Sequence, residues 1–206
     1  MKVLLINGSP HEKGCTYTAL SLIAGELKAQ GIETEILHVG GQPVGGCIGC
    51  GGCRSGNGCV FGGVVNEAIE KAKTADAFVF GSPVHYASAA GNMASFMDRL
   101  AYAGGKYLAY KPAAVCCSAR RAGTTSTLDQ LVKYPQFFHM PLVNGSYWAM
   151  VHGSNPEQVL QDAEGCAVMQ ELGRNMAWLL RCIEAGKAAG IGHPQNPPRP
   201  MTNFIR

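Results

Sequence analysis

The chain has 206 residues, of which 47% are hydrophobic and 15% charged, a composition that favours a packed core and excludes intrinsic disorder. Its 17 basic and 14 acidic residues leave a net charge of +3 without a basic cluster, so we expect no nucleic-acid partner. No apolar run approaches the ~18 residues of a membrane span, so no membrane partner is expected either.

Nine cysteines occur without an export signal, because the apolar run at residues 3–6 is short and no small-residue cleavage site follows it. We therefore expect a cytoplasmic protein, since a reducing compartment keeps thiols free for redox or metal chemistry. The 27 glycines gather in clusters without a fixed period, which indicates turns close to a ligand.

The predicted elements alternate along the chain. Apolar or alternating runs predict five strands, at residues 3–6, 33–39, 77–80, 113–117 and within 141–150. Helical spacing predicts helices at residues 16–30, 63–74, 91–103 and 126–134, and a last helical region from Pro156 to about Ala189. This alternation predicts an α/β three-layer sandwich with a five-stranded parallel sheet, in a single domain over residues 1–206. A ligand is then expected at the carboxyl ends of the strands.

The loop of residues 8–18 follows the first strand and carries hydroxyl and thiol groups. It matches neither the dinucleotide fingerprint G-x-G-x-x-G nor the P-loop pattern G-x-x-x-x-G-K-[ST]. Small residues and free amides at a helix N-terminus still favour a bound monophosphate, and the alternative is a capped helix start without a ligand. The candidate cofactor-binding residues of this loop are Ser9, His11, Cys15, Thr16 and Thr18.

Three short motifs carry a resemblance to a known family. They are Asn-Gly-Ser-Pro at residues 7–10, Gly-Ser-Pro-Val-His-Tyr at 81–86 and Phe-Met-Asp-Arg at 96–99. With them the whole chain resembles the flavodoxin-like NAD(P)H-dependent FMN reductases and their relatives, the iron–sulfur flavoproteins. The resemblance implies a flavodoxin-like fold that binds FMN non-covalently, with the phosphate on residues 8–18 and the ring along residues 83–86. It also implies NAD(P)H as electron donor, and a homodimer or dimer of dimers.

The loops after the third and fourth strands have a physical logic of their own. Pro83 fixes its own φ and biases Ser82 to extended backbone, so the next amides are held rigidly against a ring edge. An aromatic side chain at Tyr86 could stack on that ring, and arginines after the fourth strand could bind its polar edge, a ribityl chain or NAD(P)H phosphates. The alternatives are a buried turn and a solvated basic loop. The candidates in these two loops are Pro83, Val84, His85, Tyr86, Ser118, Arg120, Arg121 and Gly123.

Four cysteines stand in the pattern C-x2-C-x2-C-x5-C within residues 43–60, called the Cys loop below. The compact spacing is typical of [4Fe–4S] ligation and similar to that of the iron–sulfur flavoproteins, with zinc as the next choice. The rest of the chain looks more like reductases in which this loop carries no cluster, and Phe61-Gly62-Gly63 replaces the acidic run usual in relatives. We therefore expect no metal and a loop that forms a wall of the flavin pocket. The alternative cluster ligands are Cys47, Cys50, Cys53 and Cys59.

These observations predict an FMN-dependent NAD(P)H oxidoreductase that passes electrons to a small acceptor such as a quinone. The flavin carries the chemistry, so no catalytic side chain is expected. The alternatives are an iron–sulfur flavoprotein in an electron-transfer chain, with a [4Fe–4S] cluster beside FMN, and a non-catalytic flavin-binding module. The C-terminal tail, residues 190–206, ends with an apolar pair that suggests docking on another surface such as a second subunit. A frayed end is the alternative.

Overall fold

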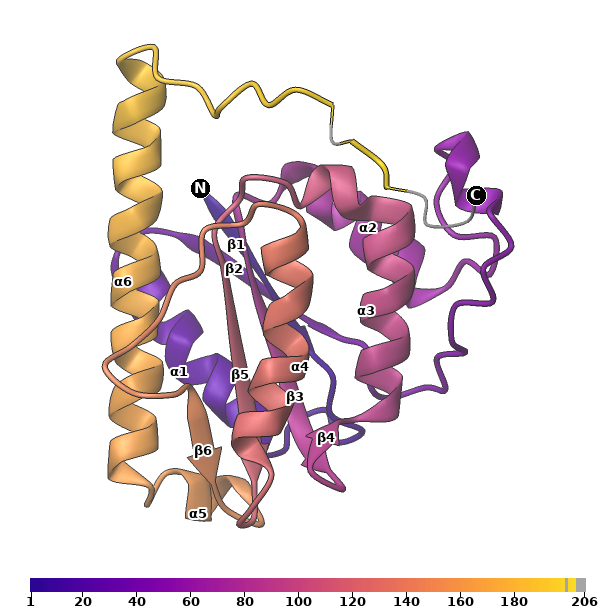
Figure 1. Cartoon of the computed structure of the whole chain (residues 1–206). Helices are drawn as coiled ribbons and strands as arrows, with labels where there is room; N and C mark the ends of the chain where they lie inside the picture. The colour runs from indigo at the N-terminus through magenta and orange to yellow at the C-terminus, as the bar shows by residue number, and fades with distance from the viewer. Residues whose placement is uncertain (199, 203–206) are drawn as a thin grey trace.

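Five parallel strands form one sheet in the order β2-β1-β3-β5-β6 in the computed structural model, which describes residues 1–198 and 200–202 (Figure 1). The strands are β1 (Lys2–Asn7), β2 (Glu33–His38), β3 (Ala77–His85), β5 (Ala113–Ala119) and β6 (Met150–His152). The two-residue strand β4 (Ser88–Ala89) pairs antiparallel with the end of β3. The parallel order is that of flavodoxin-like sheets, which confirms the predicted α/β fold.

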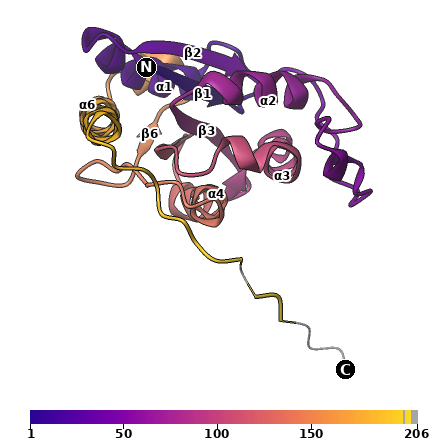
Figure 2. The ribbon, with the colours of Figure 1, turned by 90° about the horizontal axis from the view of Figure 1, so that it is seen from above.

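Helices cover both faces of this sheet (Figure 2). On one face lie α1 (Cys15–Ala29), α5 (Pro156–Val159) and α6 (Ala163–Ala188). On the other lie α2 (Val64–Thr74), α3 (Gly91–Gly104) and α4 (Thr124–Phe137). Two short 3₁₀ helices are η1 (Gly52–Ser55) in the Cys loop and η2 (Gly105–Tyr107) after α3. The three layers place the carboxyl ends of all five parallel strands at one edge of the molecule.

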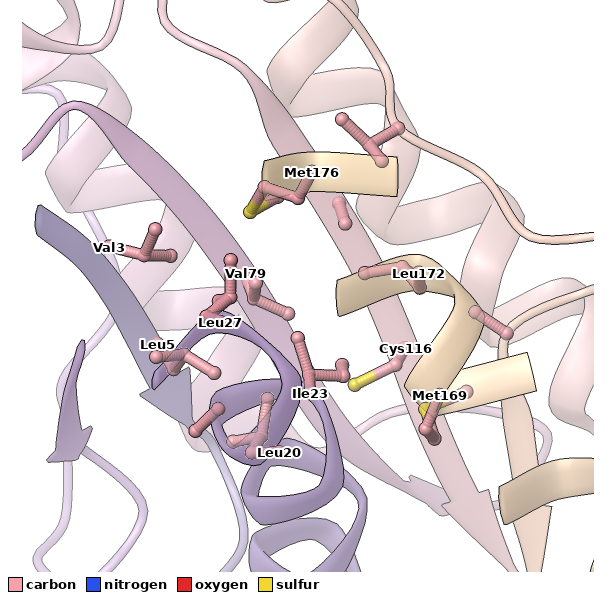
Figure 3. Close-up of a cluster of buried hydrophobic side chains, with 14 of the residues drawn as sticks. Val3, Leu5, Leu20, Ile23, Leu27, Val79, Cys116, Met169, Leu172 and Met176 are labelled. Atoms are coloured by element: carbon pink, nitrogen blue, oxygen red, sulfur yellow. The ribbon is translucent and has the colours of Figure 1, made fainter. Parts of the chain in front are cut away.

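The central strands are apolar on both faces because each face meets a helical layer. Val3 and Leu5 of β1 pack toward α1 and α6, as Figure 3 shows. Leu4 and Ile6 alternate with them and pack toward the opposite layer. All four side chains are buried, and each contributes about 1.5–3 kcal/mol through removal of apolar surface from water. Because successive side chains point to opposite faces and both faces are buried, β1 is an unbroken apolar run in the sequence.

The last strand differs from its prediction. Leu142 makes an isolated bridge to Ala113, and regular pairing resumes only at β6, beside the end of β5. Between them, the Ser146 amide and hydroxyl both donate to a carboxylate oxygen of Glu171 on α6, at 2.9 and 2.6 Å. That attachment holds Ser146 against α6, and β6 begins only at Met150, at the last position of the predicted range.

The last helical region is also divided. Asn155 caps the short helix α5 by accepting a hydrogen bond from the Gln158 amide, and Asp162 caps α6 by accepting from the Gly165 amide. A second cap three residues beyond α5 starts a new helix, so the helical region predicted from Pro156 to about Ala189 consists of two helices. Within the described residues, no helix combines the length and apolarity needed to cross a bilayer. The apolar pair at residues 204 and 205, predicted to dock on another surface, lies outside the described residues.

Candidate functional site

A shallow cavity of about 150 Å³ lies at the carboxyl ends of β1, β3 and β5. Three loops that are distant in sequence meet there, as the parallel topology requires. The cavity brings together most of the predicted cofactor-binding residues. Its lining consists of Ser9, His11, Cys15, Thr16, Pro83, Val84, His85, Ser118, Ala119, Arg120 and Gly153.

The first loop is held by hydrogen bonds on several sides. The Ser9 amide donates to Asn7 Oδ1 at 3.1 Å, and the His11 amide donates to Ser9 Oγ at 3.1 Å. His38, at the end of β2, contacts the Ser9 carbonyl oxygen through Nε2 at 2.7 Å. Gly40 packs so closely that a Cβ there would lie 2.2 Å from the same carbonyl oxygen. The loop is therefore preorganised, and none of Asn7, His38 and Gly40 was singled out from the sequence as a binding residue.

The start of α1 offers an anion site. Gly14 at the N-cap gives no side-chain hydrogen bond, and the first turn carries no acidic residue. Free amides and the positive end of the helix dipole therefore face the cavity. Beside them stand the hydroxyls of Thr16 and Ser118, 2.8 Å apart and both buried, together with that of Ser9. Neutral donors around a helix N-terminus fit the monophosphate of FMN.

Cys15 also lines this cavity. Its thiol donates to the Gly153 carbonyl oxygen at 3.5 Å, and partial burial raises the pKa of that thiol. Cys15 is thus a neutral wall residue in this arrangement. Its contact joins the start of α1 to the loop after β6. Ala119 and Gly153, also in the lining, were not among the predicted binding residues, although Ala119 ends β5 and Gly153 directly follows β6.

The segment after Pro83 is a tight hairpin. Val84 pairs with Ala89 and His85 with Ser88, leaving Tyr86 and Ala87 at the tip with φ angles of 48° and 59°. Two successive positive φ angles define a turn that normally carries Asn or Gly, so this tip is strained. It turns the Tyr86 side chain fully into solvent. Pro83, Val84 and His85 line the cavity, whereas stacking of Tyr86 on a flavin stays a prediction.

Three further candidates lie beside the cavity and not in its lining. Thr18 donates its hydroxyl to the Gly14 carbonyl oxygen at 3.2 Å, within its own helix. Gly123 has a φ of 92° and approaches the hairpin tip, where a Cβ would lie 2.6 Å from Ala87 Cα. Arg120 lines the cavity and is exposed, while its neighbour Arg121 is exposed outside it. Direct contacts of Thr18, Arg121 and Gly123 with a cofactor stay predictions.

The Cys loop surrounds a second cavity, of about 290 Å³. All four of its cysteines line that cavity; Cys47 and Cys50 are exposed, and Cys53 and Cys59 are partly buried. Within the described residues, no three His, Cys, Asp or Glu side chains come close enough to hold a single metal ion. A four-iron cluster spaces its thiolate ligands more widely than a single ion does. The four thiols therefore fit a cluster in kind and number.

Comparison with known proteins gives the same assignment as the geometry. Residues 1–155 match the family described as NADPH-dependent FMN reductase. An iron-sulfur flavoprotein of Methanocaldococcus jannaschii is 28% identical over 192 residues, covering 89% of this chain and 100% of the relative. One from Methanosarcina thermophila is 22% identical over 192 residues, covering 91% and 99%.

Among solved structures, the apo form of the NADH:FMN oxidoreductase EMOB superposes with a TM-score of 0.64 at 17% identity, covering 86% of this chain and 89% of that one. A flavodoxin from the domain Archaea superposes with a TM-score of 0.60 at 14% identity, covering 88% and 99%. These two likenesses bear on the fold, which is flavodoxin-like. The family match over residues 1–155 bears on the chemistry. The chain therefore belongs to the NADPH-dependent FMN reductase family, and it is an FMN-dependent oxidoreductase.

Proposed function

We propose that the protein transfers electrons from NAD(P)H, through FMN, to a small organic acceptor such as a quinone. The observation that carries the proposal is the cavity at the carboxyl ends of β1, β3 and β5. It combines an uncapped helix N-terminus with the hydroxyls of Ser9, Thr16 and Ser118. When bound, FMN supplies the two-electron chemistry that links a nicotinamide donor to an acceptor.

The side chains and backbone of the site bind and orient the cofactor. The three hydroxyls and the α1 amides bind the phosphate, and residues 83–85 present rigid backbone to the ring edge. Ser82 stabilises that segment, because its hydroxyl donates to the Pro83 carbonyl oxygen at 2.9 Å and accepts from the Ala90 amide at 3.0 Å. The exposed guanidinium of Arg120 adds positive charge at the cavity, which favours an anionic ligand.

A second copy of the chain completes the site in this proposal. The cavity measures about 150 Å³, below the ~300–1,000 Å³ typical of small-molecule sites. One chain therefore leaves most of an FMN ring uncovered. The exposed tip of the β3–β4 hairpin adjoins the cavity and presents Tyr86 to whatever covers the ring. A homodimer with FMN near its interface satisfies both observations.

Cofactor selectivity tests the proposal. Protein stripped of flavin and titrated with FMN or FAD should bind FMN more tightly, because the cavity offers a monophosphate site and no adenylate pocket. Ser9→Glu places a carboxylate against the phosphate and should abolish FMN binding. Equal affinity for FAD and FMN, or FMN binding that survives Ser9→Glu, would place the phosphate elsewhere.

A second candidate function is that of an iron–sulfur flavoprotein. It is supported by the four thiols around one cavity and by the relatives of that name. Iron content of protein purified without oxygen decides between the two. About four irons per chain would establish the cluster and assign Cys47, Cys50, Cys53 and Cys59 as its ligands. Negligible iron, with FMN content unchanged in Cys50→Ser, would favour a Cys loop that holds no cluster and forms a wall of the flavin pocket.

A further inference from the structure

Arg99, on α3, is the buried cation beside the Cys loop. Its side chain is only 6% exposed, and all three of its nitrogens donate hydrogen bonds. Nε donates to Cys59 Sγ at 3.3 Å, Nη1 to the Gly45 carbonyl oxygen at 3.3 Å, and Nη2 to the Gly62 carbonyl oxygen at 3.0 Å. The planar guanidinium therefore directs three of its five N–H donors to the Cys loop and to Gly62, just beyond it.

Two of the three acceptors of Arg99 lie on either side of the cysteines in sequence. Gly45 precedes Cys47, and Gly62 follows Cys59. Arg99 thus joins the two ends of a glycine-rich segment that runs outside α3, on the opposite side of the molecule from α6 (Figures 1 and 2). Between those ends the only regular element is the short helix η1. Arg99 therefore links these two ends of the segment directly.

The charge of Arg99 has no ordinary partner. Within the described part of the chain, no salt bridge joins it to a carboxylate, and its closest aromatic contact is the ring of exposed Phe61, at 5.4 Å from the guanidinium carbon. A guanidinium stays charged under all ordinary conditions, and burying it without an anion is costly. The sulfur of Cys59 becomes that anion when it is a metal-bound thiolate.

Cys59 is also held through its backbone. Its amide donates to Asn66 Oδ1 at 2.8 Å, and Asn66 Nδ2 donates to its carbonyl oxygen at 3.0 Å. Asn66 lies on α2, so two helices fix this cysteine, one through its backbone and one through its sulfur. Cys47 and Cys50 have no such support and are exposed. Cys59 is therefore held in position by α2 and α3 before any cluster binds.

The geometry points to Arg99 as the positioning residue for an iron–sulfur cluster on the Cys loop, an inference that rests on the second candidate function. It contacts Gly45 and Gly62, on either side of the four cysteines, and donates a hydrogen bond to the sulfur of the fourth ligand. A hydrogen bond and a positive charge at a ligand sulfur stabilise the more negative, reduced cluster, so Arg99 raises the reduction potential. Asn66 holds the same cysteine without touching its sulfur.

The test compares four variants of the full-length flavoprotein, purified and reconstituted with iron and sulfide without oxygen. Arg99→Met removes both the guanidinium donors and the positive charge. Arg99→Lys keeps the charge but cannot make the three hydrogen bonds of the guanidinium. Asn66→Ala loosens Cys59 but leaves its sulfur contact. Arg181→Met is the matched control, because Arg181 donates to the Gln30 carbonyl oxygen far from the loop. Iron per chain, FMN per chain and the cluster potential, from a redox titration followed by electron paramagnetic resonance, are measured for each.

Arg99→Met should hold less than half the wild-type iron, and its remaining cluster should titrate at a more negative potential. Arg99→Lys should recover part of the iron and most of the potential. Asn66→Ala should lose iron without a shift in potential, and Arg181→Met should match the wild type. Wild-type iron and potential in both Arg99 variants would overturn the inference alone. A wild-type chain that takes up no iron would overturn the iron–sulfur candidate and this inference with it, while FMN content still tests the reductase proposal.

Discussion

The hydroxyls of Thr16 and Ser118 lie 2.8 Å apart although 102 positions separate them in the chain. Thr16 belongs to the first turn of α1, and Ser118 lies near the end of β5. Their hydrogen bond joins two of the three loops that form the cavity. It needs only one of the two protons, so the other hydroxyl can still donate to a phosphate oxygen.

Removal of the Thr16 hydroxyl should weaken FMN binding. Thr16→Val keeps the shape of the side chain and removes one donor, which costs about 1.4 kcal/mol and raises the Kd about tenfold. Isothermal titration or fluorescence quenching of FMN measures the change. Thr74→Val, at an exposed position on α2, is the matched control and should leave the Kd unchanged. An unaltered Kd in Thr16→Val would mean that the phosphate lies elsewhere.

Gly40 should tolerate no side chain. A Cβ at this buried position would lie 2.2 Å from the Ser9 carbonyl oxygen, which is backbone and cannot rotate away. Gly40→Ala should therefore displace the loop of residues 8–18 and lower FMN affinity at least tenfold. Gly25→Ala, in an exposed part of α1 with nothing within 4 Å of its Cβ, should instead stabilise the protein by about 0.5–1 kcal/mol. Equal FMN affinity in the two variants would contradict a role for the close contact between Gly40 and Ser9 in cofactor binding.

The strained hairpin tip predicts two substitutions of opposite sign. Ala87→Gly relieves a left-handed φ of 59° and should raise the free energy of unfolding by up to about 1 kcal/mol. Gly123→Ala combines a φ of 92° with a 2.6 Å approach to Ala87 Cα, and should lower it by about 1–3 kcal/mol. Urea denaturation of both variants checks the signs. A gain in stability from Gly123→Ala would show that the tip is not packed against α4.

Stability should fall at alkaline pH through a buried thiol. Burial raises the pKa of Cys117 from an ordinary value of 9.0 to about 12, so the folded protein keeps a proton that the unfolded chain releases. The neutral thiol therefore contributes stability that is fully present below pH 9 and is lost progressively as pH rises toward 12. Cys117→Ala should show a shallower decline of the melting temperature over that range than the wild type. Identical declines would show that Cys117 does not titrate in this way; Cys182→Ala, at an exposed thiol, is the control.

The sheet could be predicted because its signals are local. β1 and the first half of β3 are continuous apolar runs bounded by turn residues, a pattern typical of a parallel strand covered on both faces. The region around β6 could not be predicted in the same way. Its interruption depends on hydrogen bonds between Ser146 and Glu171, 25 positions apart, and no period in the sequence indicates such a contact.

The site shows the same division. The topology brings strand ends together, so the loops containing Ser9, Pro83 and Ser118 could be predicted to meet. The direction of Tyr86 could not, because a Tyr-Ala pair does not signal a turn with two positive φ angles. The contact of His38 with the Ser9 carbonyl oxygen was equally hidden, since it depends on the three-dimensional placement of β2 beside β1.

Anaerobic reduction of the bound cofactor tests the central claim most directly. Protein loaded with FMN is titrated with NADPH or NADH without oxygen while flavin absorbance is followed, and a quinone is then added. The account predicts about one FMN per chain, loss of its absorbance with about one equivalent of NADPH or NADH, and recovery of that absorbance when the quinone is added. A flavin that binds with this stoichiometry but stays oxidised in excess NADH and NADPH would contradict it and leave a flavin-binding module.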